Sequence, residues 1–452
     1  MTTLLKSKPT CDRGEGEKGM KWTKTATINT SNHLEIGGLD LLELAKEIGT
    51  PAYLLDYAQL KQNIEDYRSY FKSELFETEI IYASKALACI GMYQILAKEG
   101  LSADVVSGGE LYTALKADFP AAKLFFHGNN KTHEEIHLAV QNEIGYFIID
   151  NAYEFEKLKN ELENKTIKQK VLLRVNPGIE AHTHEYIQTS KNNSKFGLSI
   201  YQTEAEQLIS ELEQHPNIDF RGIHCHIGSQ ILEGGSYRKA ADFMCRYIRK
   251  LEDKGHPIAE LNLGGGFGIA YLESQSVESV ESVVSQLIKA IESALRTYHI
   301  QLEKVMIEPG RSIVGNAGIT LYQIGGIKKT YGGTQYLFVD GGMSDNPRPA
   351  LYQAEYEAAL VKQVEGVEKE KVTIAGKCCE TGDILIKDIL LPMTQVGDYI
   401  AIRGTGAYNY SMASHYNRIP KPPVYLLEAG RFKTLIERES WEDLLAKDQR
   451  VW

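Results

Sequence analysis

The chain has 452 residues, of which 43% are hydrophobic and 24% are charged, and its formal net charge is -10 at pH 7. This length exceeds what one hydrophobic core usually supports, so we expect two domains, and no apolar run approaches the roughly 18 residues that a membrane helix needs. The acidic balance argues against a nucleic-acid partner, because phosphate binding requires a basic face, and no membrane partner is expected.

The chain begins with a polar segment. Residues 1–25 are rich in Gly and Lys and lack an apolar h-region, so we expect a flexible tail rather than a secretory signal. The six cysteines of the whole chain do not make a disulfide framework. We therefore expect a reducing, cytoplasmic compartment.

Eight short apolar segments follow, at spacings that leave room for a helix between them. They are "EIIYASK" near 80, "LSADVVS" near 102, "KLFFHG" near 123, "GYFIID" near 146, "KVLLRVNPG" near 171, "FRGIHCHIGS" near 221, "AELNLGGGFG" near 260 and "EKVMIEPGR" near 304. Intervening segments such as "GELYTALKA" have helical patterns, and the two longest connections, 178–219 and 269–302, also contain amphipathic stretches. This alternation predicts a (β/α)8, TIM-like barrel over residues 57–310.

After Arg311 the pattern changes to strands separated by Gly-rich turns. Examples are "GITLYQIGGIKKTYGG", "TQYLFVDGGM" and "GDYIAIRGTGAY". These segments predict an antiparallel β domain over residues 311–452. "TPAYLLD" at 50–56 is a further strand ahead of the barrel, and we assign residues 26–56 to the same β domain, which we expect to be sandwich-like or barrel-like.

Two loops with Gly and Arg follow the seventh and eighth barrel strands. In a (β/α)8 barrel the active site lies at the C-terminal ends of the strands, and these two loops commonly hold phosphate. Here they contain Gly264-Gly265-Gly266-Phe267-Gly268 and Glu308-Pro309-Gly310-Arg311. Glycines let backbone N–H groups approach an anion closely, although a tight barrel turn would also explain them. A Rossmann site is disfavoured, because the spacing is not G-x-G-x-x-G.

Lys85 ends the first barrel strand at the same rim. A lysine desolvated there has a lowered pKa, becomes nucleophilic and can form a Schiff base with pyridoxal phosphate. A lysine that snorkels from a strand end is the alternative. Glu308 favours the cofactor, since a carboxylate facing a pyridine nitrogen keeps it protonated and improves the ring as an electron sink.

His224 and His226 alternate with Cys225, so both point to one face of their strand, inward if the strand lines the barrel. Two histidines could hold a metal, but the carboxylates of a barrel metallohydrolase are not obvious at neighbouring strand ends, so we expect none. An imidazole of His226 stacked on the cofactor ring, with Ser229 near the phosphate, explains the motif better. A second His-x-His, "AHTHE" at 181–185, lies in a long loop, where a surface or substrate-loop role is favoured over metal ligation.

The β domain has its own chemical candidates, namely Arg348, Tyr352, Cys379, Glu380 and Tyr408. An arginine binds a carboxylate through two hydrogen bonds, a thiol delivers a proton, and a carboxylate holds an ammonium group. Cys379 read alone is equally explained as a small buried hydrophobe.

Together these segments are similar to the alanine-racemase-type (β/α)8 pyridoxal-phosphate decarboxylases, which are fold type III enzymes. The resemblance covers residues from about 50 to 435. It rests on motifs in the family's order, namely "RVNPGIEAHTHEYIQTSKNNSKFG", "HCHIGSQ", "LNLGGGFGI", "EPGRSIVGNAG", "RPALY", "CCETGD" and "GAYNYSMASHYN".

The resemblance implies a role for each candidate. Lys85 would be the Schiff-base lysine, His226 would stack on the ring, and Cys379 would be the proton donor. The implied cofactor-binding residues are Lys85, His226, Ser229, Gly265, Gly266, Gly268, Glu308, Pro309, Gly310, Arg311 and Tyr408. The implied substrate-binding residues are Arg311, Arg348, Tyr352, Glu380 and Tyr408.

The implied reaction is removal of CO2 from the D-configured centre of meso-2,6-diaminopimelate to yield L-lysine, the last step of lysine biosynthesis. The implied assembly is a homodimer with shared active sites, to which Cys379 and Glu380 contribute across the interface. Two positions depart from the family pattern: Leu87 stands where Asn usually follows Lys-Ala, and Tyr356 stands where a histidine is common.

Three other functions remain open at this point. A related decarboxylase would act on ornithine, arginine or carboxynorspermidine, and Arg348 argues against the simple diamino acids because they lack a distal carboxylate. A non-catalytic relative would only bind a partner, which fits poorly with Lys85, Glu308 and Cys379 occurring together. A racemase would need a second acid/base group on the opposite ring face.

Overall fold

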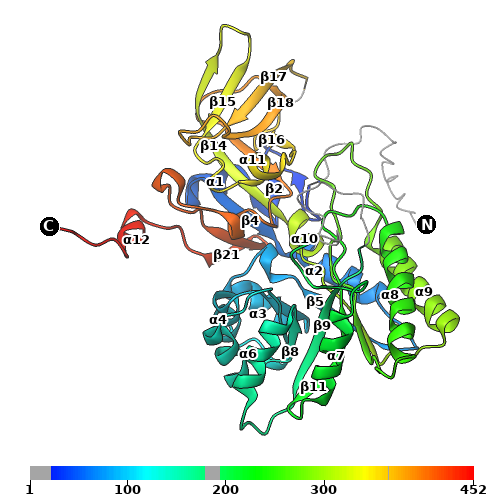
Figure 1. Cartoon of the computed structure of the whole chain (residues 1–452). Coiled ribbons are helices and arrows are strands. Elements are labelled where there is room, and N and C mark those ends of the chain that lie inside the picture. Colours follow the sequence, from blue (N-terminus) through cyan, green and yellow to red (C-terminus); the bar gives the residue numbers. More distant parts are fainter. Residues whose placement is uncertain (1–21, 179–193, 365) are drawn as a thin grey trace, which may run out of the picture.

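The computed structural model describes residues 22–178, 194–364 and 366–452. They form a barrel of parallel strands surrounded by helices and, beside it, a second part built on a twisted sheet (Figure 1). Residues 1–21 of the expected tail, and the "AHTHE" segment, lie outside the described residues.

The barrel consists of eight parallel strands that close on themselves. They are β5 (Glu77–Tyr82), β6 (Ser102–Val105), β7 (Leu124–Phe126), β8 (Tyr146–Ile149), β9 (Gln169–Asn176), β11 (Ile218–His224), β12 (Glu260–Asn262) and β13 (Lys304–Ile307). Their order around the barrel follows the chain, β9 pairs with both β8 and β11, and β13 pairs with β5 to close the ring. Each strand coincides with one of the eight apolar segments, so the predicted barrel is confirmed.

Large apolar side chains fill the inside of the barrel. The buried cluster there consists of Ile81, Phe125, Tyr146, Ile148, Leu172 and Met306. The rings of Phe125 and Tyr146 stack with their centroids 4.4 Å apart. Since burying such a side chain contributes about 1.5–3 kcal/mol, the interior is a packed core.

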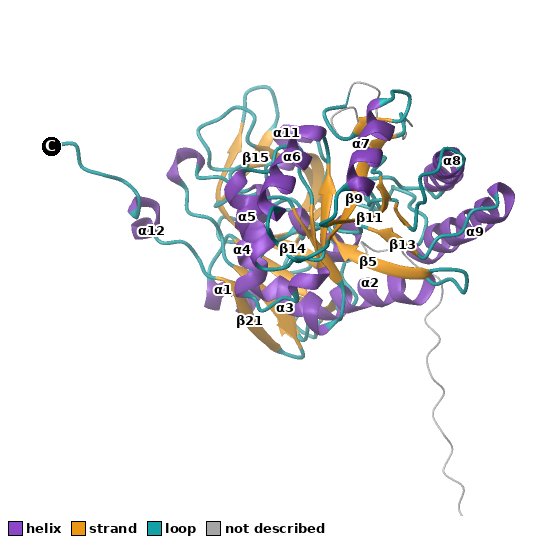
Figure 2. Cartoon of the chain, turned by 60° about the horizontal axis from the view of Figure 1, so that its bottom comes forward, coloured by secondary structure: helices purple, strands orange, loops and turns teal. Residues whose placement is uncertain are grey.

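In the described residues, eight helices surround the strands, as Figure 2 illustrates. They are α2 (Tyr57–Tyr70), α3 (Ile90–Lys98), α4 (Gly108–Lys116), α5 (His133–Gln141), α6 (Ala152–Leu162), α7 (Glu204–Gln214), α8 (Gly235–Glu252) and α9 (Val280–Tyr298). The long connections contain α7 and α9, as their amphipathic patterns predict. Polar caps fix several helix starts: Thr132 and Glu135, for example, form a capping box on α5.

The second part is a sheet of order β18-β17-β15-β14-β4-β20-β21, to which β19 and β16 are added through β14. Its strands are β4 (Ala52–Asp56), β14 (Gly318–Lys329), β15 (Gln335–Val339), β16 (Ala358–Leu360), β17 (Lys369–Ala375), β18 (Ile384–Pro392), β19 (Tyr399–Arg403), β20 (Val424–Glu428) and β21 (Arg431–Ile436). The "TPAYLLD" segment forms β4, which lies between β14 and β20.

Two pairings of this sheet differ from the antiparallel prediction. β15 pairs with β17 in parallel, and so does β4 with β20. Parallel neighbours need a long connection. The barrel lies between β4 and β20 in the sequence, and residues 340–368, with α11 (Arg348–Tyr352) and β16, lie between β15 and β17.

The two chain ends of the described structure lie on the second part. The strands β1 (Thr27–Ile28), β2 (Leu34–Ile36) and β3 (Leu39–Asp40) form a small antiparallel sheet ahead of α1 (Leu41–Ile48). After β21, a terminal segment that contains α12 (Trp441–Leu445) projects away from the rest of the molecule in both views (Figures 1 and 2).

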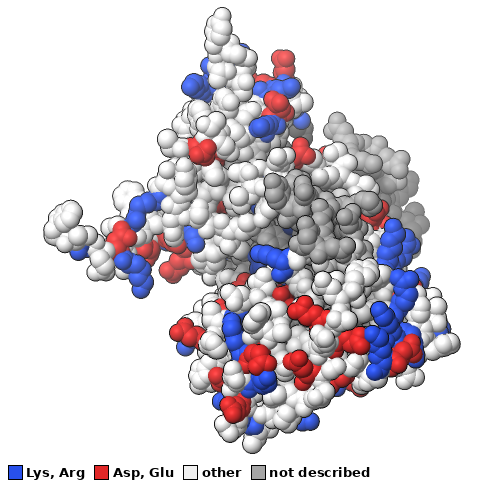
Figure 3. Space-filling model, in the orientation of Figure 1, with Lys and Arg blue, Asp and Glu red and all other residues white. Residues whose placement is uncertain are grey.

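The surface agrees with the composition. No helix among residues 22–178, 194–364 and 366–452 is long and apolar enough to cross a membrane. On the face drawn in Figure 3, basic side chains lie among acidic ones over the barrel.

Candidate active site

A cavity of about 360 Å³ opens between the C-terminal rim of the barrel and the second part of the molecule. Seven residues that the sequence singled out line it together: Lys85, His226, Ser229, Arg311, Arg348, Tyr352 and Tyr408. A smaller recess adjoins it, and its lining adds Gly265, Gly266, Glu308 and Gly310. Side chains that lie far apart in the chain are thus brought to one site.

The recess is shaped by glycines. A Cβ on Gly265 would lie 2.0 Å from the carbonyl oxygen of Glu308, so no side chain fits there. Gly266 has φ +104°, a left-handed conformation that other residues rarely adopt. Two other residues expected to bind the cofactor, Gly268 and Pro309, do not line the recess: Gly268 donates to the Ile231 carbonyl, and the Pro309 carbonyl accepts from Ala83.

Lys85 lies in a 3₁₀ turn, Ser84–Ala86, directly after β5. Its side chain forms no hydrogen bond or ion pair within the described part of the chain. The residue is exposed in the cavity, so the expectation of a desolvated lysine is wrong. Asp104, at the end of β6, accepts a hydrogen bond of 2.7 Å from the Ser84 N–H and so fixes the turn that presents Lys85.

Glu308, which follows β13, lies at the bottom of the recess and is surrounded by donors. Its Oε1 lies 2.9 Å from Nε2 of His127 and accepts a hydrogen bond of 2.8 Å from Asn262, and its Oε2 lies 3.2 Å from Nε2 of His224. Burial by itself would raise the pKa of Glu308, but the two imidazoles hold it well below its ordinary value. Burial lowers the pKa of His127, and that of His224 to about 4. The cluster is therefore an anionic carboxylate that two neutral histidines and an amide hold in place.

This cluster has the residue types of a metal site, and its ligand atoms lie within 4.8 Å of one another. The imidazole and amide nitrogens are, however, already directed at the carboxylate. Lys85 and Arg311 line the same recess, and their cationic side chains disfavour a metal cation there. The surroundings suit an organic anion better than a metal ion.

His226 lines both the cavity and the recess. Its Nδ1 accepts a hydrogen bond of 3.1 Å from the Gly265 N–H. Burial and the nearby Lys85 hold the pKa of His226 well below its ordinary value. The ring is therefore a neutral imidazole at a fixed place in the wall.

Two buried arginines face the cavity without a carboxylate partner. Arg311 donates to Tyr271 and, at 3.1 Å, to Ser229, and its guanidinium lies 4.6 Å from the ring centroid of Tyr408. Arg348 donates to the Tyr356 hydroxyl and lies 4.5 Å from the ring centroid of Tyr271. No Asp or Glu oxygen lies within 4 Å of either guanidinium in the described ranges, and Nε of Arg311 is buried without a partner. The wall thus offers two cations to anionic groups of a ligand.

Cys379 and Glu380 do not line this cavity. Both are exposed on the loop between β17 and β18, where the Cys379 N–H donates to Asn417 at 2.8 Å. Tyr416 of the adjacent loop contacts both residues at 3.5 Å. If they take part in the chemistry, they do so outside the cavity of their own chain.

Sequence reasoning missed four residues of the site: Asp104, His127, Asn262 and Tyr271. Three of them stand at or just beyond the end of a barrel strand, the position that marks rim residues in this fold. In the segment "KLFFHG", His127 directly follows the strand and could have been found in this way. Tyr271 lies further along the loop after β12, where no comparable signal exists.

The rim of the parallel barrel brings together a lysine, a buried carboxylate and a glycine-lined recess, and a β domain lies beside it. This is the arrangement of a fold type III pyridoxal-phosphate enzyme. Residues 58–315 match the family described as pyridoxal-dependent decarboxylase, pyridoxal binding domain. The chain is 44% identical to the diaminopimelate decarboxylase of Bacillus subtilis (94% of this chain, 97% of the relative) and 45% identical to that of Staphylococcus aureus (94% and 100%). The crystal structure of the M. jannaschii diaminopimelate decarboxylase in co-complex with L-lysine superimposes with a TM-score of 0.89 at 34% identity, covering 95% of this chain and 98% of that one. The chain therefore belongs to the pyridoxal-dependent decarboxylases, in the family of the diaminopimelate decarboxylases.

Proposed function

We propose that the protein removes the carboxyl group from the D-configured centre of meso-2,6-diaminopimelate, with pyridoxal phosphate attached to Lys85, and releases L-lysine and CO2. One observation carries the proposal: within the described residues, a lysine free of hydrogen bonds and two arginines without a carboxylate partner face one cavity. The diaminopimelate decarboxylases to which the chain is similar, one of them in co-complex with L-lysine, support the choice of substrate.

The residues at the rim fit pyridoxal phosphate. When bound, the cofactor takes up the electron pair that departing CO2 leaves at the α-carbon. Lys85 would supply the amine that bonds it, the His226 imidazole would lie against the ring, and the Glu308 carboxylate would keep the pyridine nitrogen protonated. The residues proposed to hold the phosphate end are Ser229, Gly265, Gly266, Gly310, Arg311 and Tyr408, and Gly268 and Pro309 are proposed to support these loops from behind.

The substrate is held by charge. A bidentate arginine–carboxylate pair is both strong and directional. We assign Arg348, with Arg311 and Tyr352, to the carboxylates of the substrate, and Arg348 to the distal one that lysine and ornithine lack. Its guanidinium is already oriented by Tyr356 and Tyr271, which reduces the entropy lost on binding.

The proton that completes the reaction comes from a second copy of the chain. Cys379 and Glu380 are exposed and lie outside the cavity of their own chain, which is what a site shared across a homodimer requires. In the proposed dimer, Cys379 of the partner subunit donates a proton to the α-carbon, and Glu380 of the partner subunit binds the substrate.

The terminal segment 437–452 is part of this proposed interface. It carries four large exposed side chains, Trp441 (77% exposed), Leu445 (58%), Val451 (82%) and Trp452 (104%). Its base is tied to the loop that also supports Cys379, through contacts of Glu439 with His415 and of Asp448 with Arg418. Because this segment projects away from the rest of the molecule (Figure 1) and its apolar groups are uncovered, we assign a second copy of the chain as its binding partner.

The test is CO2 release from meso-diaminopimelate, compared with ornithine, lysine and arginine, each with and without added pyridoxal phosphate. We expect release that depends on the cofactor and is fastest with meso-diaminopimelate. Equal or faster release from ornithine, lysine or arginine would contradict the assigned substrate. We place the reaction in the cytoplasm, where the free cysteines of the described chain stay reduced.

A further inference from the structure

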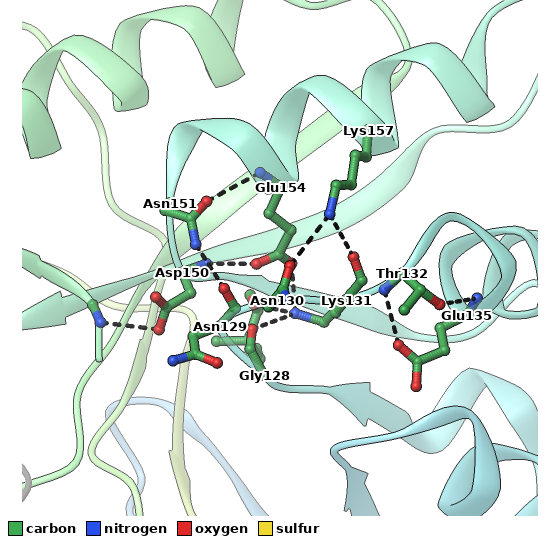
Figure 4. Close-up of polar contacts among 12 residues, drawn as sticks. Gly128, Asn129, Asn130, Lys131, Thr132, Glu135, Asp150, Asn151, Glu154 and Lys157 are labelled. Atoms are coloured by element: carbon green, nitrogen blue, oxygen red, sulfur yellow. Dashed lines mark hydrogen bonds and ion pairs between the residues drawn. The ribbon is translucent and has the colours of Figure 1, made fainter. Parts of the chain in front are cut away.

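A buried lysine, Lys131, stands just outside the recess, in the loop between β7 and α5. Its side chain has no solvent exposure, and that of its partner Glu154 is 2% exposed. The Lys131 ammonium donates to the Glu154 carboxylate and, at 3.0 Å each, to the carbonyl oxygens of Gly128 and Ile148 (Figure 4). All three hydrogens of the ammonium thus form hydrogen bonds. Two of them bind backbone carbonyls near the ends of the neighbouring strands β7 and β8.

Further hydrogen bonds tie the same loop to the loop after β8. Asn151 donates to the Asn129 carbonyl at 3.0 Å, and Lys157 donates to the Lys131 carbonyl at 2.9 Å. The second oxygen of Glu154 accepts from the Asp150 N–H at 3.1 Å. Figure 4 shows these groups converging on Lys131, so residues 128–131 have little freedom to move.

The residue that precedes this loop is His127, which contacts Glu308. The His127 N–H donates to the Val105 carbonyl at 2.8 Å, and its ring meets that of His224 edge to face at 4.9 Å. Gly128 has φ +119°, so the chain turns sharply where the Lys131 ammonium holds the Gly128 carbonyl. The carbonyl that Lys131 holds therefore belongs to the residue that directly follows His127.

An ion pair at this depth is not explained by stability alone. Replacing a buried ion pair by apolar side chains of similar volume is often neutral or stabilising, whereas removing one partner is strongly destabilising. An apolar pair could fill the same space, but it could not donate to the carbonyls of Gly128 and Ile148. The hydrogen bonds to the backbone are what the ammonium contributes beyond packing.

We propose that Lys131 is a positioning residue for the cofactor site: by holding the carbonyl of Gly128 it fixes His127 against Glu308, the carboxylate assigned to the pyridine nitrogen. This inference rests on the proposed function. Lys131 does not touch the recess and acts through His127. Its loss should therefore change the electronic state of bound cofactor as well as the rate.

The experiment compares Lys131→Met with the double variant Lys131→Met/Glu154→Leu. The single variant leaves a buried carboxylate unpaired and should lower the melting temperature, while the double variant should regain most of it. The double variant therefore tests the proposal even if the single variant does not fold. The readouts are thermal unfolding, the pH titration of the absorbance of bound pyridoxal phosphate, and kcat.

We expect the double variant to be stable but to show a displaced midpoint in the absorbance titration and a kcat lower by about tenfold to 10²-fold, as for displaced catalytic groups. His127→Gln should displace the midpoint in the same direction. The matched control is Lys159→Met/Glu156→Leu, an ion pair on α6, the helix that carries Glu154. Its side chains are 37% and 53% exposed, and the control should change neither the absorbance midpoint nor kcat.

A double variant with the wild-type titration and kcat would overturn the inference and leave the proposed function standing. A wild-type protein that binds no pyridoxal phosphate would overturn both. The two failures are thus distinguishable in one set of measurements.

Discussion

His127 and Glu308 follow strands β7 and β13, which are not neighbours in the barrel, yet Nε2 of one lies 2.9 Å from Oε1 of the other. With His224 and Asn262, this contact keeps a carboxylate ionised and fixed at the bottom of the recess. We predict that Glu308→Gln still binds pyridoxal phosphate but decarboxylates about 10²-fold more slowly or worse, because an amide cannot hold the pyridinium proton. Unchanged kcat, measured with cofactor saturation verified by absorbance, would mean that Glu308 does not face the ring.

The neutral histidine beside Glu308 should make stability depend on pH. Burial lowers the pKa of His224 from 6.5 to about 4, so the unfolded chain binds more protons than the folded chain between these values. The free energy of unfolding should therefore fall as the pH falls through this window, by about 1.4 kcal/mol per pH unit for one such group. The lowered pKa of Glu308 has the same effect. The stability that the ionised carboxylate contributes is lost as the pH falls through the pKa of Glu308 in the folded chain.

Urea unfolding across this window tests the assignment. His224→Gln retains a donor for Glu308 but does not titrate, so the slope of the free energy of unfolding against pH should be smaller than in the wild type. His133→Gln, an exposed position at the start of α5, is the matched control and should keep the wild-type slope. Identical slopes for all three proteins would show that His224 does not titrate abnormally.

The site residues of the barrel that sequence reasoning found stand where a barrel strand ends. Lys85, Glu308 and Arg311 could be placed at one rim because the fold alone brings strand ends together. The interpretation of Lys85 as desolvated was wrong, because the exposure of a side chain depends on how far the β domain covers the rim. The proposed role of Lys131 was not predictable either, since the pairing of β7 with β8 brings its partners Gly128 and Ile148 together.

Lys85 itself gives a chemical test. We predict that Lys85→Ala abolishes turnover and the absorbance band of bound cofactor, because no other described lysine lines the cavity. Borohydride reduction of the wild-type protein with pyridoxal phosphate, followed by peptide mapping, should label Lys85. The control Lys239→Ala, at an exposed position on α8, should behave as the wild type. A label at any other lysine would refute the assignment.

Arg348 should determine substrate choice. Arg348→Lys keeps the charge but loses the fork that binds a carboxylate through two hydrogen bonds. We expect kcat/KM for meso-diaminopimelate to fall about 10- to 10²-fold, as for hydrogen bonds to charged groups, with cofactor affinity unchanged. Discrimination against lysine should fall with it, whereas Arg238→Lys, at an exposed position on α8, should change nothing. Preserved discrimination would assign the distal carboxylate to another residue.

The exposed apolar side chains of the terminal segment predict that formation of the dimer depends on α12. Trp441→Ser/Leu445→Ser removes two exposed apolar groups, and sedimentation should then show a weaker dimer, since large aromatic side chains often dominate an interface. Tyr153→Ser, which is 84% exposed on α6, is a control of similar exposure and should leave the dimer intact. An unchanged dissociation constant in the double variant would remove the terminal segment from the interface.

Two copies of the chain should share each active site. Cys379 lies outside the cavity of its own chain, so we expect each site to combine Lys85 of one subunit with Cys379 of the partner subunit. Lys85→Ala and Cys379→Ala should each be inactive, but a mixed dimer contains one site with both substitutions and one site with neither. Random mixing makes about half of the dimers hybrid, so roughly a quarter of wild-type activity should return when subunits exchange freely. Subunit exchange is verified by pull-down of differently tagged chains. If hybrids form and the mixture stays inactive, each site is built within one chain, because every site would then retain one of the two substitutions.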